Sequence, residues 1–447
     1  MKKLTSHSTL FALLLTPVAS FGQPFFYRTG AYNYQPRFER NCLSTWEVNV
    51  QGGGTRTGYE SEYAPGGAKS KVIVAPTAPT ETHGNNTQNS NVLNLYGWQN
   101  FQFLGTNIVG NPGTDIYNQN LVVLDQLPQN GTFGWVQYAG KFSYIEADLY
   151  FAQNFCKGFF ADLNIPIVHT KISGVGFTDM SPTNAGFPNV NDPNWQFLIN
   201  PTNLATTLAE YSLTASDYSK SGVGDIEIYL GWTMNKEDIC DSIDFLDATI
   251  KVGFNVPSGY QKNQNQAFSL AAGYDGHFGV PVSFDAAIGF LEWVTVGAHV
   301  GGTFFTSKTK SYRMKTSVAQ NGYIKLGLGQ AKMDMGNLFD AGAYLKADHI
   351  FKGLSLMFGY VYARQSKSTL TPTNTVQFPT AIVNGDNMLY SWYSHALSGS
   401  VEYDFAREGK RFNPVIGIFY SQPIAGKRVF NTKTGGGYAG VNVAWDF

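Results

Sequence analysis

Charge is scarce in this 447-residue chain, because Asp, Glu, Lys and Arg make up only 14% of it, against roughly 25% in soluble domains. There is no basic excess, since the formal net charge is -1, whereas a nucleic-acid-binding surface needs Lys and Arg to neutralise phosphates. Beyond the N-terminus, no uninterrupted apolar run reaches the roughly 18 residues of a membrane-spanning helix. The composition therefore disfavours a cytosolic enzyme, a nucleic-acid-binding protein and a helical membrane protein.

Aromatic residues (15%) and glycine (48 residues) are abundant instead, which is typical of sheets with many turns. The N-terminus resembles a bacterial secretory signal peptide, with lysines at positions 2 and 3, an apolar stretch over 10–15 and small residues around Ser20 and Gly22. We expect cleavage after Gly22, with a cut after Ser20 as the alternative. Residues 1–22 are then a signal peptide, and 23–447 form the mature protein.

Cysteine is rare, with three residues: Cys42, Cys156 and Cys240. An exported bacterial chain enters an oxidising periplasm, where two of these three can form a disulfide and one is left over. The spacing does not tell which two.

Apolar and polar residues alternate over long stretches of the mature chain, for example over 225–233 and 245–256. A barrel strand in a membrane needs this pattern because one face meets lipid and the other faces the lumen. A soluble sandwich rarely sustains it for ten or more residues in strand after strand. We therefore predict an all-β fold, a transmembrane antiparallel β-barrel of about twelve strands. The predicted strands are 44–54, 142–152, 158–170, 222–234, 243–256, 279–290, 292–305, 339–350, 353–366, 391–404, 411–421 and 436–447.

The connections between these strands alternate in length. The long ones are 55–141, 171–221, 257–278, 306–338, 367–390 and 422–435, and the others are as short as the step from Phe290 to Glu292. Long extracellular loops and short periplasmic turns are the asymmetry expected of such barrels. This polarity places the N-terminus and all three cysteines on the periplasmic side.

Two features leave fourteen strands as an alternative. Pro166 interrupts the third predicted strand and removes a ladder donor. The long first loop, 55–141, contains an apolar segment at 91–104 that is a candidate for a further strand pair, a lid or a lumen insert.

The chain ends in alternating apolar residues, with Val441, Val443, Trp445 and Phe447 on one face. A terminal Phe in this setting resembles the assembly signal of the Gram-negative outer-membrane β-barrel (porin-like) superfamily. The resemblance covers the whole mature chain. It implies insertion into the outer membrane by the barrel-assembly machinery, which recognises this last strand.

A second resemblance lies in Gly222-Val223-Gly224-Asp225-Ile226 and Val256-Pro257-Ser258-Gly259. These motifs are similar to those of outer-membrane channels for aromatic or other hydrophobic compounds. Cysteines on the periplasmic side of a barrel also resemble the major outer-membrane proteins of intracellular bacteria such as Chlamydia and Legionella, a likeness of architecture without a shared motif.

With the apolar face towards lipid, the opposite face is rich in carboxylates. The predicted pore-lining residues are Glu146, Asp148, Asp225, Glu227, Asp247, Lys251, Asp285, Asp340, Lys346 and Glu402, and Glu47, Asp162, Asp348, Asp404 and Asp446 share that face. An acidic lumen concentrates cations and disfavours anions, so we predict a cation-preferring channel. Each single carboxylate has an alternative role at the rim or in a pair with a loop arginine.

The fourth long loop carries a basic cluster, Lys308, Lys310, Arg313 and Lys315. Three roles remain open for it: contact with anionic lipopolysaccharide, folding inward opposite the acidic lumen, or solvation in a mobile loop.

No catalytic motif stands out. Ser394, His395 and Ser398 are close in sequence, but residues three apart on a strand point to opposite faces. No zinc spacing or nucleotide-binding fingerprint is present, so we predict no enzyme activity, metal or cofactor.

We predict an outer-membrane porin-like channel for passive diffusion of small hydrophilic solutes. The alternatives are an uptake channel for hydrophobic or aromatic compounds, and a structural envelope protein or adhesin anchored by the barrel. The expected partners are outer-membrane lipid and lipopolysaccharide, the assembly machinery, small solutes and, through self-association, a second copy of the chain, but no nucleic acid.

Overall fold

The computed structural model describes residues 43–59, 89–97, 99–100, 135–179, 199–240, 242–291, 293–316, 320, 322–351, 353–405 and 411–444. The predicted signal peptide, Cys42, Asp446 and two residues of the predicted assembly signal, Trp445 and Phe447, lie outside the described residues.

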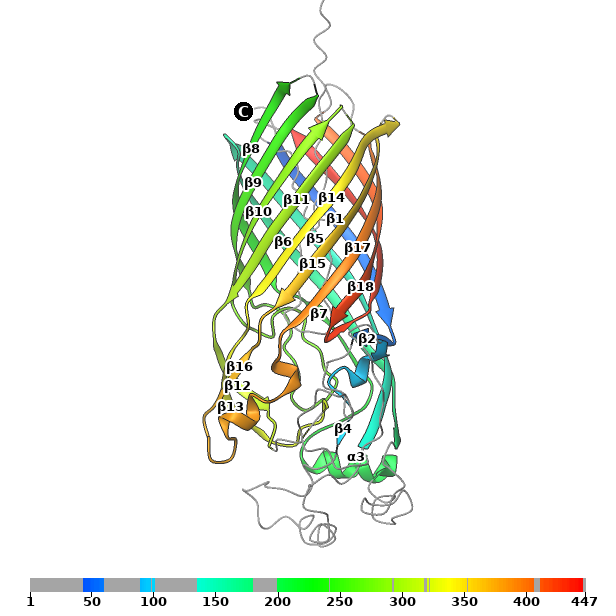
Figure 1. Ribbon diagram of the computed structural model, residues 1–447, viewed down its shortest axis with the longest axis vertical. Helices are drawn as coiled ribbons and strands as arrows, with labels where there is room; N and C mark the ends of the chain where they lie inside the picture. The colour runs from blue at the N-terminus through cyan, green and yellow to red at the C-terminus, as the bar shows by residue number, and fades with distance from the viewer. Residues whose placement is uncertain are drawn as a thin grey trace, which may run out of the picture.

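Twelve antiparallel strands close into a barrel (Figure 1). In chain order they are β1 (Leu43–Thr55), β5 (Trp135–Cys156), β6 (Phe159–Asp179), β8 (Ile226–Cys240), β9 (Ile243–Val256), β10 (Gly279–Phe290), β11 (Val294–Phe305), β14 (Leu338–Phe351), β15 (Leu354–Gln365), β17 (Trp392–Asp404), β18 (Phe412–Lys427) and β20 (Lys433–Ala444). Each strand pairs with the next one along the chain, and β1 pairs with β20 to close the ring. The twelve-strand prediction is confirmed, and each predicted range overlaps one of these strands.

The alternative of fourteen wall strands is wrong. The described part of 91–104 holds the end of β3 (Asn89–Asn91), a short 3-10 helix (Val92–Asn94) and β4 (Gln99–Asn100). Two hydrogen-bonded residues in β4 pair only with the start of β5. This segment therefore adds nothing to the closed ring.

Pro166 lies in β6 at the point where its neighbour changes. β6 pairs with β8 up to Asn164 and with β7 (Tyr218–Val223) from Ile167 onward. The Pro166 carbonyl accepts a hydrogen bond from the Gly224 amide at 2.7 Å, in the break between β7 and β8. A proline is tolerated here because the ladder is interrupted on that side.

The wall is apolar outside and polar inside. Trp46, Val48 and Val50 on β1 are 55%, 47% and 50% exposed, whereas the intervening residues Glu47, Asn49 and Gln51 are buried. Since successive side chains on a strand point to opposite faces, the polar residues face the barrel interior. This is the reverse of a water-soluble barrel.

Aromatic rings on the inner face lie against glycines of the neighbouring strand. Phe245 is the cross-strand partner of Gly289, and Tyr344 is the partner of Gly297. A Cβ atom at Gly289 would stand 2.0 Å from the Phe245 ring, and one at Gly297 would stand 2.1 Å from the Tyr344 ring. These glycines are required for close packing, because any side chain would displace the ring.

The connections on one side of the barrel fold into a cap at one end (Figure 1). The cap contains two small sheets, β12 (Lys308–Arg313) with β13 (Leu328–Asp334) and β16 (Thr369–Pro372), and β2 (Thr57–Tyr59) with β3 and β19 (Val429–Phe430). It also holds α3 (Pro201–Glu210), α4 (Thr380–Val383) and a 3-10 helix (Asn387–Leu389). The predicted long loop 422–435 is mostly strand, because β18 and β20 extend to leave only 428–432 between them.

The cap has an apolar core that continues onto the wall strands β5 and β6. Leu93, Tyr96, Leu204, Phe268 and Tyr323 are buried together from four separate stretches of the chain. The Gln99 side chain bonds both backbone groups of Ile324, at 2.8 and 3.2 Å. The loops at this end are therefore packed against one another.

Candidate functional site

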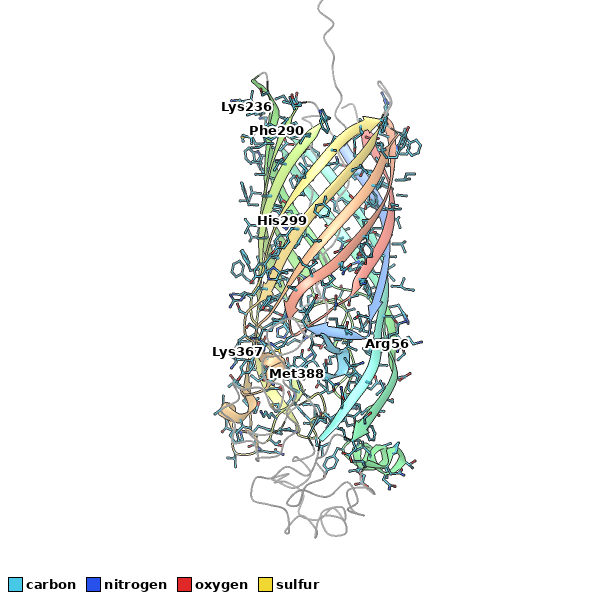
Figure 2. All side chains as sticks on the ribbon, turned by 45° about the vertical axis from the view of Figure 1, so that its right-hand side comes forward. Arg56, Lys236, Phe290, His299, Lys367 and Met388 are labelled. Atoms are coloured by element: carbon cyan, nitrogen blue, oxygen red, sulfur yellow. The ribbon has the colours of Figure 1, made fainter. Side chains whose placement is uncertain are left out.

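The barrel interior is lined with buried carboxylates from many strands. Glu146, Asp148, Glu227, Asp285, Asp340 and Glu402 are buried, as are Lys251 and Lys346, while Asp247 is half-buried. Figure 2 shows His299 midway along the barrel, with Lys236 and Phe290 at the end opposite the cap. The structure thus brings most of the predicted pore-lining residues to one interior, and their role in a pore stays a prediction.

Several interior carboxylates have polar partners. The Tyr438 hydroxyl donates to Glu402 at 2.7 Å, and Lys346 forms an ion pair with Asp348 at 2.6 Å. His299 lies 3.4 Å from Asp340. These contacts hold a polar interior in place against neighbouring strands.

Three interior carboxylates differ from the others. Both carboxylate oxygens of Glu47, Asp162 and Asp285 are buried without a hydrogen-bond partner among the described residues. A buried charge without a partner is costly in an apolar medium. These three side chains are therefore the strongest candidates in the barrel for contact with water or a passing cation.

Asp225 occupies a different place from the other predicted pore-lining residues. It lies between β7 and β8 and accepts backbone hydrogen bonds from Gly259 at 2.8 Å and Tyr274 at 2.6 Å. A Cβ atom at Gly273 would stand 2.2 Å from its carboxylate. The Gly-Asp and Pro-Ser-Gly motifs meet here, and Asp225 holds the 257–278 loop against the strand ends.

The predicted outer basic cluster joins parts of the cap. Lys308 donates to the Gly276 carbonyl at 2.9 Å, Lys310 pairs with Asp275 at 2.7 Å, and Lys315 donates to the Gly385 carbonyl at 3.3 Å. Arg313 donates to the carbonyls of Gln264, Leu326 and Tyr211, each within 2.8 Å. The cluster therefore cross-links loops, and its predicted contact with lipopolysaccharide stays a prediction.

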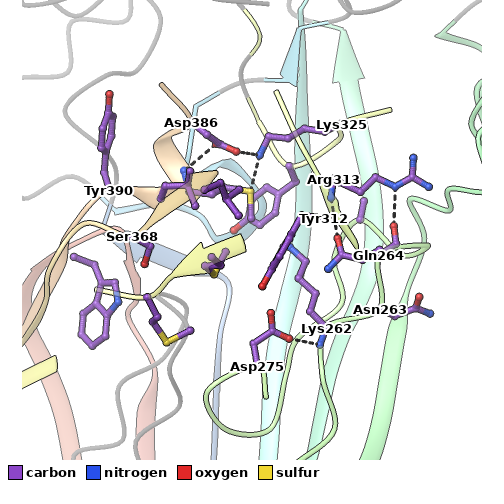
Figure 3. A pocket seen from close by; sticks show the side chains of 18 of the residues that line it. Lys262, Asn263, Gln264, Asp275, Tyr312, Arg313, Lys325, Ser368, Asp386 and Tyr390 are labelled. Carbon is purple, nitrogen blue, oxygen red and sulfur yellow. Dashed lines mark hydrogen bonds and ion pairs between the residues drawn. The ribbon is translucent and has the colours of Figure 1, made fainter. Parts of the chain in front are cut away.

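A pocket lies in the cap, bounded by the 257–278 loop, the β12–β13 hairpin and residues 365–392 (Figure 3). It encloses about 970 Å³, its open mouth included. Gln365 and Trp392, at the outer ends of β15 and β17, form part of its lining. They are joined by a hydrogen bond of 2.7 Å from the Trp392 indole, so the pocket reaches the rim of the barrel.

The pocket combines an apolar lining with ionic groups. Met333, Met335 and Leu389 contribute apolar surface. Lys325 forms an ion pair with Asp386 and donates to the Met388 sulfur at 3.0 Å. Such a mixture of apolar walls and a few placed charges is typical of small-molecule sites.

Lys262 is the pocket cation with the fewest contacts. Its backbone amide donates to Asp275 at 2.8 Å, and Figure 3 shows its side chain extending towards the Tyr312 ring. Burial and the nearby Lys325 ammonium lower the pKa of Lys262 to about 8. Sequence reasoning missed this site, because its residues come from three loops without shared periodicity.

The remaining predicted site residues are partly described. Cys156 ends β5 and Cys240 ends β8, both at short connections opposite the cap. Val441 and Val443 lie in β20, paired with Trp46 and Ser44 of β1. Their predicted roles in a disulfide and in assembly stay predictions.

Within the described ranges, no helix combines the length and hydropathy needed to cross a membrane. The same ranges hold no group of three or more His, Cys, Asp or Glu side chains arranged to bind a metal ion.

No protein-family model and no curated protein matches this chain. Solved outer-membrane channels do resemble it in fold. An outer membrane channel from Pseudomonas putida F1 has 8% identity and a TM-score of 0.47, over 94% of this chain and 100% of that one. The Ralstonia pickettii toluene transporter TbuX has 8% identity and a TM-score of 0.29, over 92% and 90%. The NanC porin has 8% identity and a TM-score of 0.28, over 68% and 94%.

Proposed function

We propose that the protein is an outer-membrane channel through which small hydrophilic solutes diffuse, with a preference for cations. The observation that carries this proposal is the inverted barrel: exposed apolar side chains outside and buried polar side chains inside, in a closed ring of twelve strands. A ring with no free edge is one of two structures that satisfy backbone hydrogen bonding in lipid. The proposal assigns no catalytic role.

The direction of insertion follows from the two ends of the barrel. The cap consists of the long connections, and the opposite end consists of short turns such as the one at Lys157 and Gly158. In outer-membrane barrels the long loops face the cell exterior and the short turns face the periplasm. We therefore place the cap outside, where it selects the solutes that reach the barrel.

The cation preference is supported by Glu47, Asp162 and Asp285. Among the described residues their oxygens have no hydrogen-bond partner, so they are open to contact with water or a hydrated cation. Carboxylates in a narrow polar interior raise the local cation concentration.

A planar bilayer experiment with a KCl gradient tests the proposal. We expect discrete conductance steps and a reversal potential that indicates cation preference. The combined variant Glu47→Gln, Asp162→Asn and Asp285→Asn is expected to reduce that preference. The matched control is Glu210→Gln with Asp334→Asn, which neutralises exposed carboxylates of the cap and should leave the reversal potential unchanged. Absence of conductance and of liposome swelling from folded protein would refute the channel.

A second candidate function is uptake of hydrophobic or aromatic compounds. The apolar lining of the cap pocket by Met333, Met335 and Trp392 favours it. It predicts entry of a neutral aromatic solute into protein-containing vesicles with little ionic current. Ionic current without such entry would favour the first function.

A further inference from the structure

The cap pocket has more cationic groups than its carboxylates neutralise. Three cationic side chains line it, Lys262, Arg313 and Lys325, together with two carboxylates, Asp275 and Asp386. Each carboxylate is already engaged, Asp386 by Lys325 and Asp275 by Lys310. Among the described residues, Lys262 and Arg313 are therefore the two lining cations that pair with neither carboxylate.

Arg313 is not available to a ligand. Its guanidinium donates to the carbonyls of Gln264 and Leu326, at 2.8 and 2.7 Å, and to Tyr211 at 2.7 Å. A planar guanidinium held by several carbonyl groups has a structural role and cannot turn without leaving those carbonyls unpaired.

Lys262 is available. Among the described residues, no carboxylate lies within ion-pair distance of its ammonium, and only its backbone amide contacts Asp275. Its side chain extends towards Tyr312 (Figure 3), and burial and the Lys325 ammonium lower its pKa although Asp275 and Asp386 act in the opposite direction.

The same pocket also has apolar walls. Met333, Met335, Leu370, Leu389 and Trp392 contribute side chains to the same pocket. A ligand here must match one positive charge at one point and an apolar surface elsewhere.

We propose that this pocket binds a small organic monoanion, with its carboxylate on Lys262 and its aromatic or aliphatic body against the methionines and Trp392. A phosphate dianion fits poorly, because the second charge would meet no free cation. The inference rests on the proposed function only in taking the cap as the outer end of a channel. The pocket offers a positive charge, whereas the barrel interior offers carboxylates. Binding of an anion in the pocket and flow of cations through the barrel can therefore be measured separately.

The test is calorimetric titration of the purified full chain, folded in a nonionic detergent, at pH 7. The probe is 3-phenylpropionate, and its neutral analogue 3-phenylpropionamide keeps the ring and chain but removes the charge. We expect the acid to bind at least tenfold more tightly than the amide. Lys262→Met is expected to remove that difference.

Lys332→Met is the matched control, because Lys332 is an exposed lysine on β13 of the same cap. It removes the same charge without touching the pocket, so it should bind the acid as the unsubstituted chain does. Heat-resistant migration in gels checks that both variants fold.

Equal binding of acid and amide, unchanged binding by Lys262→Met, or no binding of either probe would each overturn the monoanion site. Conductance without ligand tests the channel separately. Folded protein that conducts but binds no acid refutes only the pocket proposal. Protein that binds the acid but never conducts refutes only the channel.

Discussion

The wall and the cap of this molecule place their apolar and charged side chains in opposite ways. In the wall, apolar side chains such as Ile250 face outward and charged side chains such as Lys251 face inward. In the cap, Phe268 and Tyr323 form a buried core while the Val376 loop is exposed. The wall is therefore built for lipid outside and polar contents inside, and the cap is built like a water-soluble domain.

The two regions also hold their charges differently. Wall carboxylates line the barrel interior, and three of them have no hydrogen-bond partner among the described residues. Cap lysines and arginines are joined to carbonyls and carboxylates of neighbouring loops, as Arg313 and Lys310 show. Charged side chains line the interior in one region and cross-link loops in the other.

The largest expected effect is a loss of stability in the cap that leaves the wall folded. Phe268 contacts Tyr138 and Tyr323 edge to face, with ring centroids 5.3 and 5.6 Å apart. Phe268→Ala leaves a cavity that destabilises the cap by about 3–5 kcal/mol. We expect cap cleavage by a protease to become much faster while the barrel stays heat-resistant, because the closed ladder of backbone hydrogen bonds holds the wall together.

Ile418→Ala serves as the control for this variant, since Ile418 is an exposed residue on the outer face of β18. Its cap should be cleaved at the original rate. If Phe268→Ala unfolded the barrel together with the cap, the two regions would be one cooperative unit and the comparison would fail.

The next effect tests whether lipid surrounds the wall and water surrounds the cap. Ile250 on β9 and Val376 in the cap are both exposed β-branched residues, at 50% and 89%. Ile250→Arg is expected to lower the free energy of unfolding in lipid vesicles by about 2–4 kcal/mol, because lipid does not solvate the charge. Val376→Arg should change it by about 0.5 kcal/mol or less. Equal losses in a urea titration would mean that the β9 face does not meet lipid.

The contrast between regions explains what could be predicted. A period of two is imposed on every wall strand by lipid on one side, so 243–256 was identified in full and β10 matched its predicted range to the residue. Turn residues bound the wall strands, as Lys157 and Gly158, both with positive φ, do between β5 and β6. The number of wall strands follows directly from this local signal.

The cap pocket carries no such signal. Lys262, Lys325 and Asp386 come from three loops that meet only through tertiary packing. The basic cluster was visible as a run of charges, but its partners, such as the Leu326 and Gly385 carbonyls, are backbone groups that any sequence supplies. Asp225 was placed on the lumen face by alternation, and the break in the strand at Gly224 gave it another role.

The smallest expected effect tests the charge difference between the regions through pH. Burial and the Lys325 ammonium lower the pKa of Lys262 to about 8, while Asp275 and Asp386 act in the opposite direction. Lys310, whose pKa is also lowered by burial, stays paired with Asp275, and burial raises the pKa of Tyr312.

Only protonated Lys262 attracts a carboxylate, so affinity for 3-phenylpropionate is retained below pH 8 and lost above it. Between pH 7 and pH 9 the dissociation constant should rise about tenfold, as the protonated fraction of the free site falls. Lys262→Met should show no such slope in the same titrations. A slope that survives in Lys262→Met would assign the titration to Lys310 instead, and the surplus charge of the cap would then belong to the loop contacts and not to a ligand.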